Sequence, residues 1–236
     1  MNVVASIIAV ILLITGAWEE SPAEEALRHN GGAVLVYDVV SASDDEDFYV
    51  YSALDAAETI ITSRLDELGY TDAEVEITKS DKLRVLIPGA ELSDDLAASL
   101  AAPSTLEFKD ADGNVVLDAS HISWAGANYG SVGTSVQSEH HVVLEFTKEG
   151  QERFAEITEK VSKAGEGKNY LRIEVDGKVI SAPTVQETIV SDSVTISGDF
   201  DGEGADKLAS LINGAMTNMR LELVSTKQVE PSVSAK

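Results

Sequence analysis

The chain has 236 residues, enough for one large domain or two small ones with a real hydrophobic core. Its 44% hydrophobic and 25% charged residues are ordinary for a globular protein and exclude global disorder. A formal net charge of -24 without a basic stripe argues against nucleic-acid partners, and the lack of cysteine excludes disulfides, thiolate metal sites and cysteine nucleophiles.

The first segment, residues 1–18 (MNVVASIIAVILLITGAW), carries no charged side chain and is nearly long enough to cross a bilayer as a helix. Such a run is typical of a transmembrane anchor or of the apolar part of a signal peptide. Trp18 suits an interfacial position and favours the anchor, although no Lys or Arg precedes the run. We expect one transmembrane helix here, with a cleaved signal as the alternative, and the acidic remainder outside the cytoplasm.

A polar, alanine-rich stretch at 19–30 predicts a linker or a short helix. Gly31 and Gly32 then interrupt the backbone ahead of 33–40, a β-branched run that predicts a buried strand.

The next helix is expected to be capped by Ser52 and to end near Gly69, because apolar residues recur between them at helical spacing. Strands at 74–77 and 83–87 follow it. This β-α-β-β order is the first part of a ferredoxin-like unit.

Later elements come in mixed order, which indicates an α+β fold. We expect helices at 94–101, 148–163 and 204–214, and strands at 105–108, 141–146, 170–175, 178–181, 194–196 and 220–229. Thr147 is suited to cap the second of these helices. The Gly-, Ser- and Asn-rich stretch at 119–138 predicts an irregular connection between subdomains, with 126–133 as a candidate hinge.

Catalytic and metal-binding patterns are missing from the sequence. His140 and His141 would point to opposite faces of a strand and could not bind one metal together. Gly165, Gly167 and Lys168 lack the spacing of a phosphate-binding loop. We therefore expect a non-enzymatic protein without metal or cofactor.

One stretch, Asp176–Pro183 (DGKVISAP), resembles a signature of the SecD family, and the resemblance continues to Ile196–Phe200. Gly31 and Gly32 resemble the end of an early family motif, whose acidic residue is replaced here. Val229–Ser232 resembles the approach to the family's second transmembrane helix. The signature residues, with an expected structural or hinge role, are Gly31, Gly32, Asp176, Gly177, Lys178, Pro183, Gly198 and Pro231.

The resemblance implies a ferredoxin-like base subdomain at 30–114 and 200–230, with an α/β head subdomain inserted at 119–199. Residues 231–236 would be a truncated approach to the second membrane helix. Because the family's later helices do not follow, we expect a fragment, a truncated product or a diverged short copy.

In function, the resemblance implies an accessory subunit of the Sec export machinery in the bacterial cell membrane. Its extracytoplasmic domain would assist unfolded polypeptides that emerge from the SecYEG channel, with SecF as a further partner and the N-terminal helix in the membrane. Two alternatives remain: a stand-alone extracytoplasmic binding or adaptor module derived from SecD, and a hydrolase.

Overall fold

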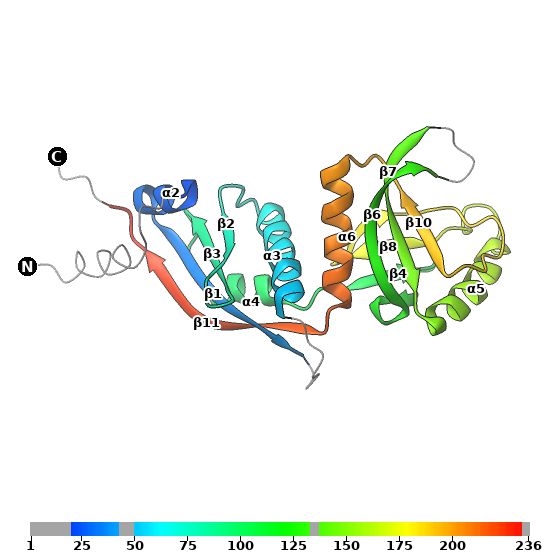
Figure 1. Cartoon of the computed structure of the whole chain (residues 1–236), viewed down its shortest axis with the longest axis horizontal. Helices are drawn as coiled ribbons and strands as arrows, with labels where there is room; N and C mark the ends of the chain where they lie inside the picture. Colours follow the sequence, from blue (N-terminus) through cyan, green and yellow to red (C-terminus); the bar gives the residue numbers. More distant parts are fainter. Residues whose placement is uncertain (1–19, 43–49, 133–136, 233–236) are drawn as a thin grey trace, which may run out of the picture.

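The computed structural model describes residues 20–42, 50–132 and 137–232. The anchor expected over 1–18 lies outside the described residues, as does the end of the tail expected at 231–236. No helix within the described ranges is long and apolar enough to cross a membrane. Figure 1 shows an elongated molecule with two lobes, which we call the base and the head after the expected subdomains.

The base is built around one antiparallel sheet in the order β11-β1-β3-β2. Its elements are β1 (Gly32–Ser41), α3 (Val50–Glu67), β2 (Glu74–Ile77), β3 (Lys82–Pro88), α4 (Asp94–Ala101) and β11 (Met219–Val229). This succession and strand order are those of the β-α-β-β-α-β unit. The head is inserted between α4 and β11.

The base core lies between the sheet and the helices α3 and α4. Alternate residues of β1 point into it, so that Leu35 and Tyr37 are fully buried. The hydroxyl of Tyr37 donates to the carbonyl oxygen of Ala97 on α4 at 2.9 Å. Because α3 begins at Val50, Ser52 lies inside the helix and is not its N-cap, which corrects the expected start.

At the outer end of the base, the short helix α2 (Pro22–Asn30) forms where a linker or a helix was expected. Ser21 and Glu24 make a reciprocal capping box at its start. Ala23 and Leu27 bury the helix against Leu86 on the sheet face away from α3. This stretch is therefore part of the folded base.

The head contains two antiparallel sheets, ordered β10-β7-β6 and β5-β4-β8-β9. Its elements are β4 (Leu106–Lys109), β5 (Val115–Asp118), the 3-10 turn η1 (Ala119–His121), β6 (Ile122–Ser131), β7 (Ser138–Phe146), α5 (Lys148–Ser162), β8 (Arg172–Val175), β9 (Lys178–Ser181), β10 (Ser193–Ser197) and α6 (Gly202–Met216). Thr147 caps α5, as expected. One hydrophobic core joins both sheets, α5 and α6.

Core membership moves the boundary between the lobes. Phe108 of β4 and Ile212 of α6 both pack in the head core, although 30–114 and 200–230 were expected to form the base. Leu117 of β5, which lies between the expected subdomains, packs in the head core as well. The head therefore begins after α4 and ends with α6. Periodicity in the sequence identifies the apolar face of an element but not the lobe against which that face packs.

The glycine-rich stretch is not a connection between the lobes. Gly126 and Gly130 lie within β6, where they pair with Val143 and Glu139 of β7. The described part of the expected hinge is thus a strand inside the head, and Gly133 lies outside the described residues. The small side chains suit close packing beside the strand, a role that composition does not distinguish from flexibility.

Candidate functional site at the base–head junction

The two lobes meet where α3 of the base and α6 of the head lie side by side (Figure 1). Gly214 of α6 packs directly against α3. A Cβ atom at this position would come within 2.6 Å of Ile60 Cδ1 and 3.5 Å of Ala56 Cβ on α3. The helix contact therefore depends on the missing side chain of Gly214.

Near the last turn of α3, Arg64 joins three parts of the molecule. Its Nη1 donates to the carbonyl oxygens of Leu100 at 2.8 Å and Ala102 at 2.6 Å, at the C-terminal end of α4. Its Nη2 donates to Oδ2 of Asp176 in the head at 2.9 Å. A helix C-terminus presents unpaired carbonyls and partial negative charge, so a guanidinium is well placed there.

Asp176, the partner of Arg64, lies in the turn between β8 and β9. Asp176 and Gly177 have φ values of 50° and 77°, as in the two-residue turns that Asp-Gly favours. Oδ1 of Asp176 accepts from the hydroxyl of Ser104 at 2.9 Å and the backbone N–H of Thr105 at 2.8 Å. Asp176 therefore fixes the turn to the segment where the chain first enters the head.

Two further ion pairs cross the junction beside Arg64. Lys178 lies 3.4 Å from Glu67, and Lys207 of α6 lies 3.2 Å from Asp66. In the described part of the chain, these and the Arg64–Asp176 pair are the ion pairs between the lobes. We call the six residues the junction charge cluster: Arg64, Asp66 and Glu67 of the base with Asp176, Lys178 and Lys207 of the head.

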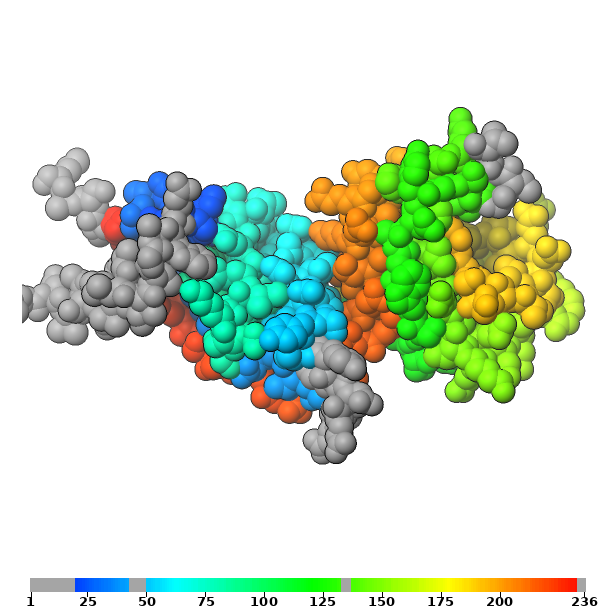
Figure 2. Space-filling view, in the orientation of Figure 1, coloured from blue at the N-terminus to red at the C-terminus, as the bar shows by residue number. Residues whose placement is uncertain are grey.

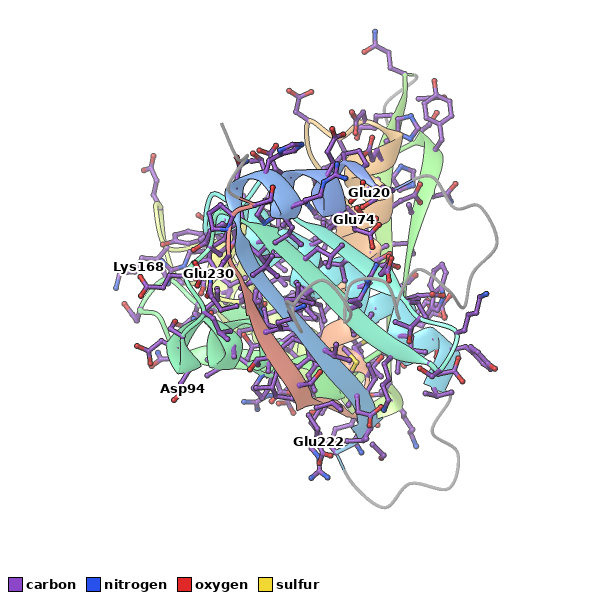
Figure 3. All side chains as sticks on the ribbon, turned by 90° about the vertical axis from the view of Figure 1, so that its left-hand side faces the viewer. Glu20, Glu74, Asp94, Lys168, Glu222 and Glu230 are labelled. Carbon is purple, nitrogen blue, oxygen red and sulfur yellow. The ribbon has the colours of Figure 1, made fainter. Side chains whose placement is uncertain are left out.

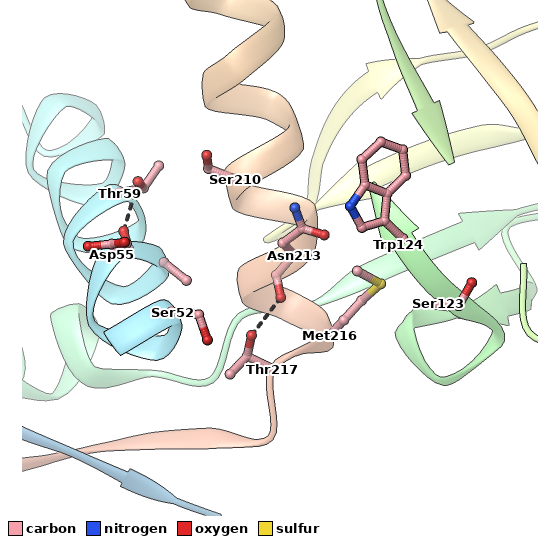
Figure 4. A pocket seen from close by; sticks show the side chains of 10 residues that line it. Ser52, Asp55, Thr59, Ser123, Trp124, Ser210, Asn213, Met216 and Thr217 are labelled. Atoms are coloured by element: carbon pink, nitrogen blue, oxygen red, sulfur yellow. Dashed lines mark hydrogen bonds between the residues drawn. The ribbon is translucent and has the colours of Figure 1, made fainter. Parts of the chain in front are cut away.

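A cleft of about 450 Å³ opens between α3, α6 and the start of β6 (Figure 4). The space-filling view in Figure 2 shows the lobes narrowing toward this boundary between α3 and α6. Hydroxyl, amide and apolar groups line the cleft, with one carboxylate. The lining residues are Ser52, Asp55, Ala56, Thr59, Ser123, Trp124, Ser210, Asn213, Met216 and Thr217.

Trp124 supplies the large apolar surface of the cleft, with 47% of the residue exposed. The pairing of β6 with β7 shifts register just before it, between Ile122 and Trp124. Its indole lies over Gly126, where any Cβ atom would overlap the ring. The bulge and the glycine together fix the ring along the strand.

Asn213 of α6 hydrogen-bonds to the edge of β6 that faces away from β7. Its side-chain Nδ2 donates to the carbonyl oxygen of Ala125 at 2.8 Å, and its Oδ1 accepts from the N–H of the same residue at 3.1 Å. The amide thus replaces a neighbouring strand at one residue of this edge. It also attaches α6 to the strand that carries Trp124.

The predicted signature residues fall in three separate places. Asp176, Gly177 and Lys178 lie at the junction, as described above. Pro183 and Gly198 lie within the head: the carbonyl of Pro183 accepts from the N–H of Leu171 at 3.1 Å, and Gly198 leaves room for the ring of Phe200.

The other signature residues meet at the outer end of the base. A Cβ atom at Gly31 would lie 2.7 Å from the carbonyl oxygen of Val229 and 2.9 Å from Cδ of Pro231. Gly32 contacts the backbone of β3 equally closely. These glycines serve packing between α2, β3 and β11.

Arg64, Trp124 and Asn213 are junction residues that the sequence interpretation did not select. Arg64 is the basic residue in the last turn of α3, a position that suits a cation in any helix. For Trp124 and Asn213 no local pattern distinguishes a junction residue from an ordinary surface or core residue.

His140, His141 and Asp118 of the head each have a local partner. His141 is buried, with Nδ1 3.1 Å from the carbonyl oxygen of Glu139, and the ring of His140 lies 4.7 Å from that of Tyr129. Hydrogen bonds from Ser120, and then from His121, lower the pKa of Asp118. Within the described ranges no three His, Asp or Glu side chains are grouped as a metal site would require.

Comparisons with known proteins agree with this division. The family model for the P1 head subdomain of SecDF matches residues 103–217, the segment that core packing assigns to the head. The protein translocase subunit SecD of Acidaminococcus fermentans is 29% identical over 99% of this chain and 52% of the relative. The SecD of Dictyoglomus turgidum is 30% identical over 74% of this chain and 41% of the relative.

A crystal structure of SecDF from Thermus thermophilus, described as a translocon-associated membrane protein, shares the fold. Its TM-score is 0.62 at 20% identity, over 97% of this chain and 35% of that one. The two lobes thus define an α+β domain of the kind that SecDF carries. The chain belongs to the SecD family. It spans about half the length of the curated relatives it matches.

Proposed function

We propose that this chain is the extracytoplasmic part of a Sec-translocase subunit and that the base–head cleft contacts unfolded polypeptides during translocation. Family membership supports a role in protein translocation, since the relatives are named protein translocase subunits. The cleft supports the contact, because its lining combines the exposed indole of Trp124 with the hydroxyls of Ser52, Thr59, Ser123 and Ser210. This is the observation that carries the proposal.

Such a lining suits partners without a common sequence. Exported polypeptides share backbone amides and scattered apolar side chains, and little else. Hydroxyl oxygens can accept a hydrogen bond from any backbone N–H, while an indole and the thioether of Met216 accept varied apolar groups. We propose a binding role without catalysis, because the lining offers its serine and threonine hydroxyls no histidine or lysine that would activate them as nucleophiles.

The base end of the molecule is proposed to face the membrane. Both ends of the described chain meet there: the N–H of Ser232 donates to the carbonyl oxygen of Arg28 at 2.9 Å. Glu20 and Glu230 lie on this same end face in Figure 3. An anchor formed by residues 1–18 in the bacterial cell membrane would direct the head away from it, toward chains leaving the SecYEG channel, with SecF as the proposed companion subunit.

An export assay with a filled cleft tests the proposal. Ser210→Trp places a large side chain on the α6 wall, whereas Ser80→Trp adds the same side chain at an exposed turn of the base. In cells that depend on this chain, Ser210→Trp is expected to slow the release of a pulse-labelled secretory precursor severalfold, and Ser80→Trp is not. Equal, wild-type release in both variants would exclude the cleft as the contact.

A further inference from the structure

The ion pairs between the lobes are concentrated within four residues at the end of α3. Arg64, Asp66 and Glu67 each face a head residue of opposite charge. The chain has a net charge of -24 and only 17 Lys and Arg residues. Two of these, Lys178 and Lys207 of the head, face Glu67 and Asp66, the two acids of this short stretch of α3. This charge complementarity is specific to one orientation of the lobes.

The central pair of this cluster is held in place on both sides. The side chain of Arg64 is 13% exposed and is already bound to the carbonyl oxygens of Leu100 and Ala102 within the base. Asp176 is already bound by Ser104 and Thr105 within the head segment. Neither side chain has to be ordered when the lobes meet, so the charge-assisted hydrogen bond between them loses little entropy.

The cluster lies at one end of the helix contact, and the cleft surrounds the rest of it. Gly214 meets Ala56 and Ile60 in the middle of α3, the cluster begins at Arg64, and the cleft is lined from Ser52 to Thr59. Asp55 and Arg64 are nine residues apart, about 13 Å along a helix. The cleft walls come from α3 of the base and from α6 and β6 of the head, so a rotation of the head that separates the charges at Arg64 would also change the spacing of the cleft walls.

We propose that the junction charge cluster is a salt-sensitive lock that sets the orientation of the head on the base and thereby the width of the cleft. Arg64 and Asp176 are its central positioning residues, and the exposed pairs of Lys178 and Lys207 add smaller contributions. Salt weakens the lock chiefly at the exposed pairs of Lys178 and Lys207, because mobile ions screen solvent-exposed charges. The orientation is a property of the chain itself and does not rest on the proposed translocation role.

Spin-label distance measurements on the full chain test the lock. The chain has no cysteine, so Asp72→Cys on the base and Glu152→Cys on the head, both exposed and away from the junction charge cluster, give one labelled pair. Asp176→Asn is the main variant, because asparagine tolerates the left-handed turn and accepts from Ser104 and Thr105 but lacks the charge. Arg64→Gln is the second variant.

In low salt the wild-type chain is expected to give one narrow distance distribution, which broadens in high salt. Asp176→Asn and Arg64→Gln are expected to raise the ratio of other orientations to the locked one about tenfold already in low salt. Lys163→Gln, which removes the Lys163–Glu159 pair within α5, is expected to match the wild type.

The lock would be overturned if Asp176→Asn and Arg64→Gln both gave the same distance distribution as the wild type at low salt and again at high salt. Circular dichroism identifies a variant that fails to fold. Should Arg64→Gln lose the contacts that it makes with α4 and unfold, Asp176→Asn decides the question alone, because its turn and its hydrogen bonds within the head remain.

Discussion

The backbone of Gly32 on β1 lies directly against the carbonyl oxygen of Ile87 on β3, without room for a Cβ atom between them. The same position has φ 144°, which L side chains rarely adopt. A methyl group would also come within 2.7 Å of Leu27 Cδ2. This contact explains a signature glycine whose role the sequence did not disclose.

We expect Gly32→Ala to lower the free energy of unfolding by about 3 kcal/mol or more, because it combines backbone strain with a clash against backbone atoms. Gly69→Ala is the matched control: Gly69 has φ 86° but nothing within 4 Å of a Cβ atom, so only the conformational cost of about 1 kcal/mol applies. Urea denaturation measures both. Equal losses in the two variants would contradict the packing role of Gly32.

The position of Trp124 depends on Gly126. In a Trp18→Phe background Trp124 is the single tryptophan of the chain. Gly126→Ala is expected to displace the indole and shift its emission toward the red, as water reaches both faces of the ring. Gly130→Ala serves as control, since the nearest atom to its Cβ would be His141 Cε1 at 4.0 Å. An unchanged spectrum in Gly126→Ala would show that the ring is not held over this residue.

The buried Tyr37 is expected to lower the free energy of unfolding in alkaline solution. Burial raises the pKa of Tyr37 to about 12, above its ordinary value of 10.0. The folded chain keeps the proton longer than the unfolded chain, so this stabilisation is complete below pH 10 and is lost as the pH rises toward 12. Between pH 9 and 11, Tyr37→Phe should lose about 1.3 kcal/mol less than the wild type, because the other tyrosines are common to both. Equal losses in denaturant titrations would contradict this assignment.

Asn213 is expected to protect the edge of β6 at Ala125. Asn213→Ala leaves a largely buried N–H and carbonyl without their partner, which should cost about 2 kcal/mol of unfolding free energy and speed hydrogen exchange at the Ala125 amide. Asn128→Ala, at an exposed position of the same strand, is the control. Slow exchange at Ala125 in Asn213→Ala would mean that another group covers this edge.

Local elements of the fold could be predicted where one physical signal dominates. The β-branched run after Gly32 forms a strand and Thr147 caps a helix, both as expected. The assignment of elements to lobes failed for β4 and α6, because their apolar faces are equally suited to either core.

The candidate site was predictable only in part. Asp176 and Lys178 were selected from the family signature, but their partners lie more than a hundred residues earlier in the chain. A lone arginine or acid on a helix surface carries no mark of the residue that it meets across a domain junction. The glycine-rich strand was misread as a hinge because small residues serve both flexibility and close packing.

Site-specific photocrosslinking to a stalled secretory polypeptide tests the central claim most directly. A photoreactive amino acid would replace Ser123 or Ser210, which line the cleft, or Ser80, which lies at an exposed turn of the base. The account predicts crosslinks to the stalled polypeptide from both cleft positions and few or none from position 80. Crosslinks absent from the cleft positions, or equally strong from position 80, would contradict it.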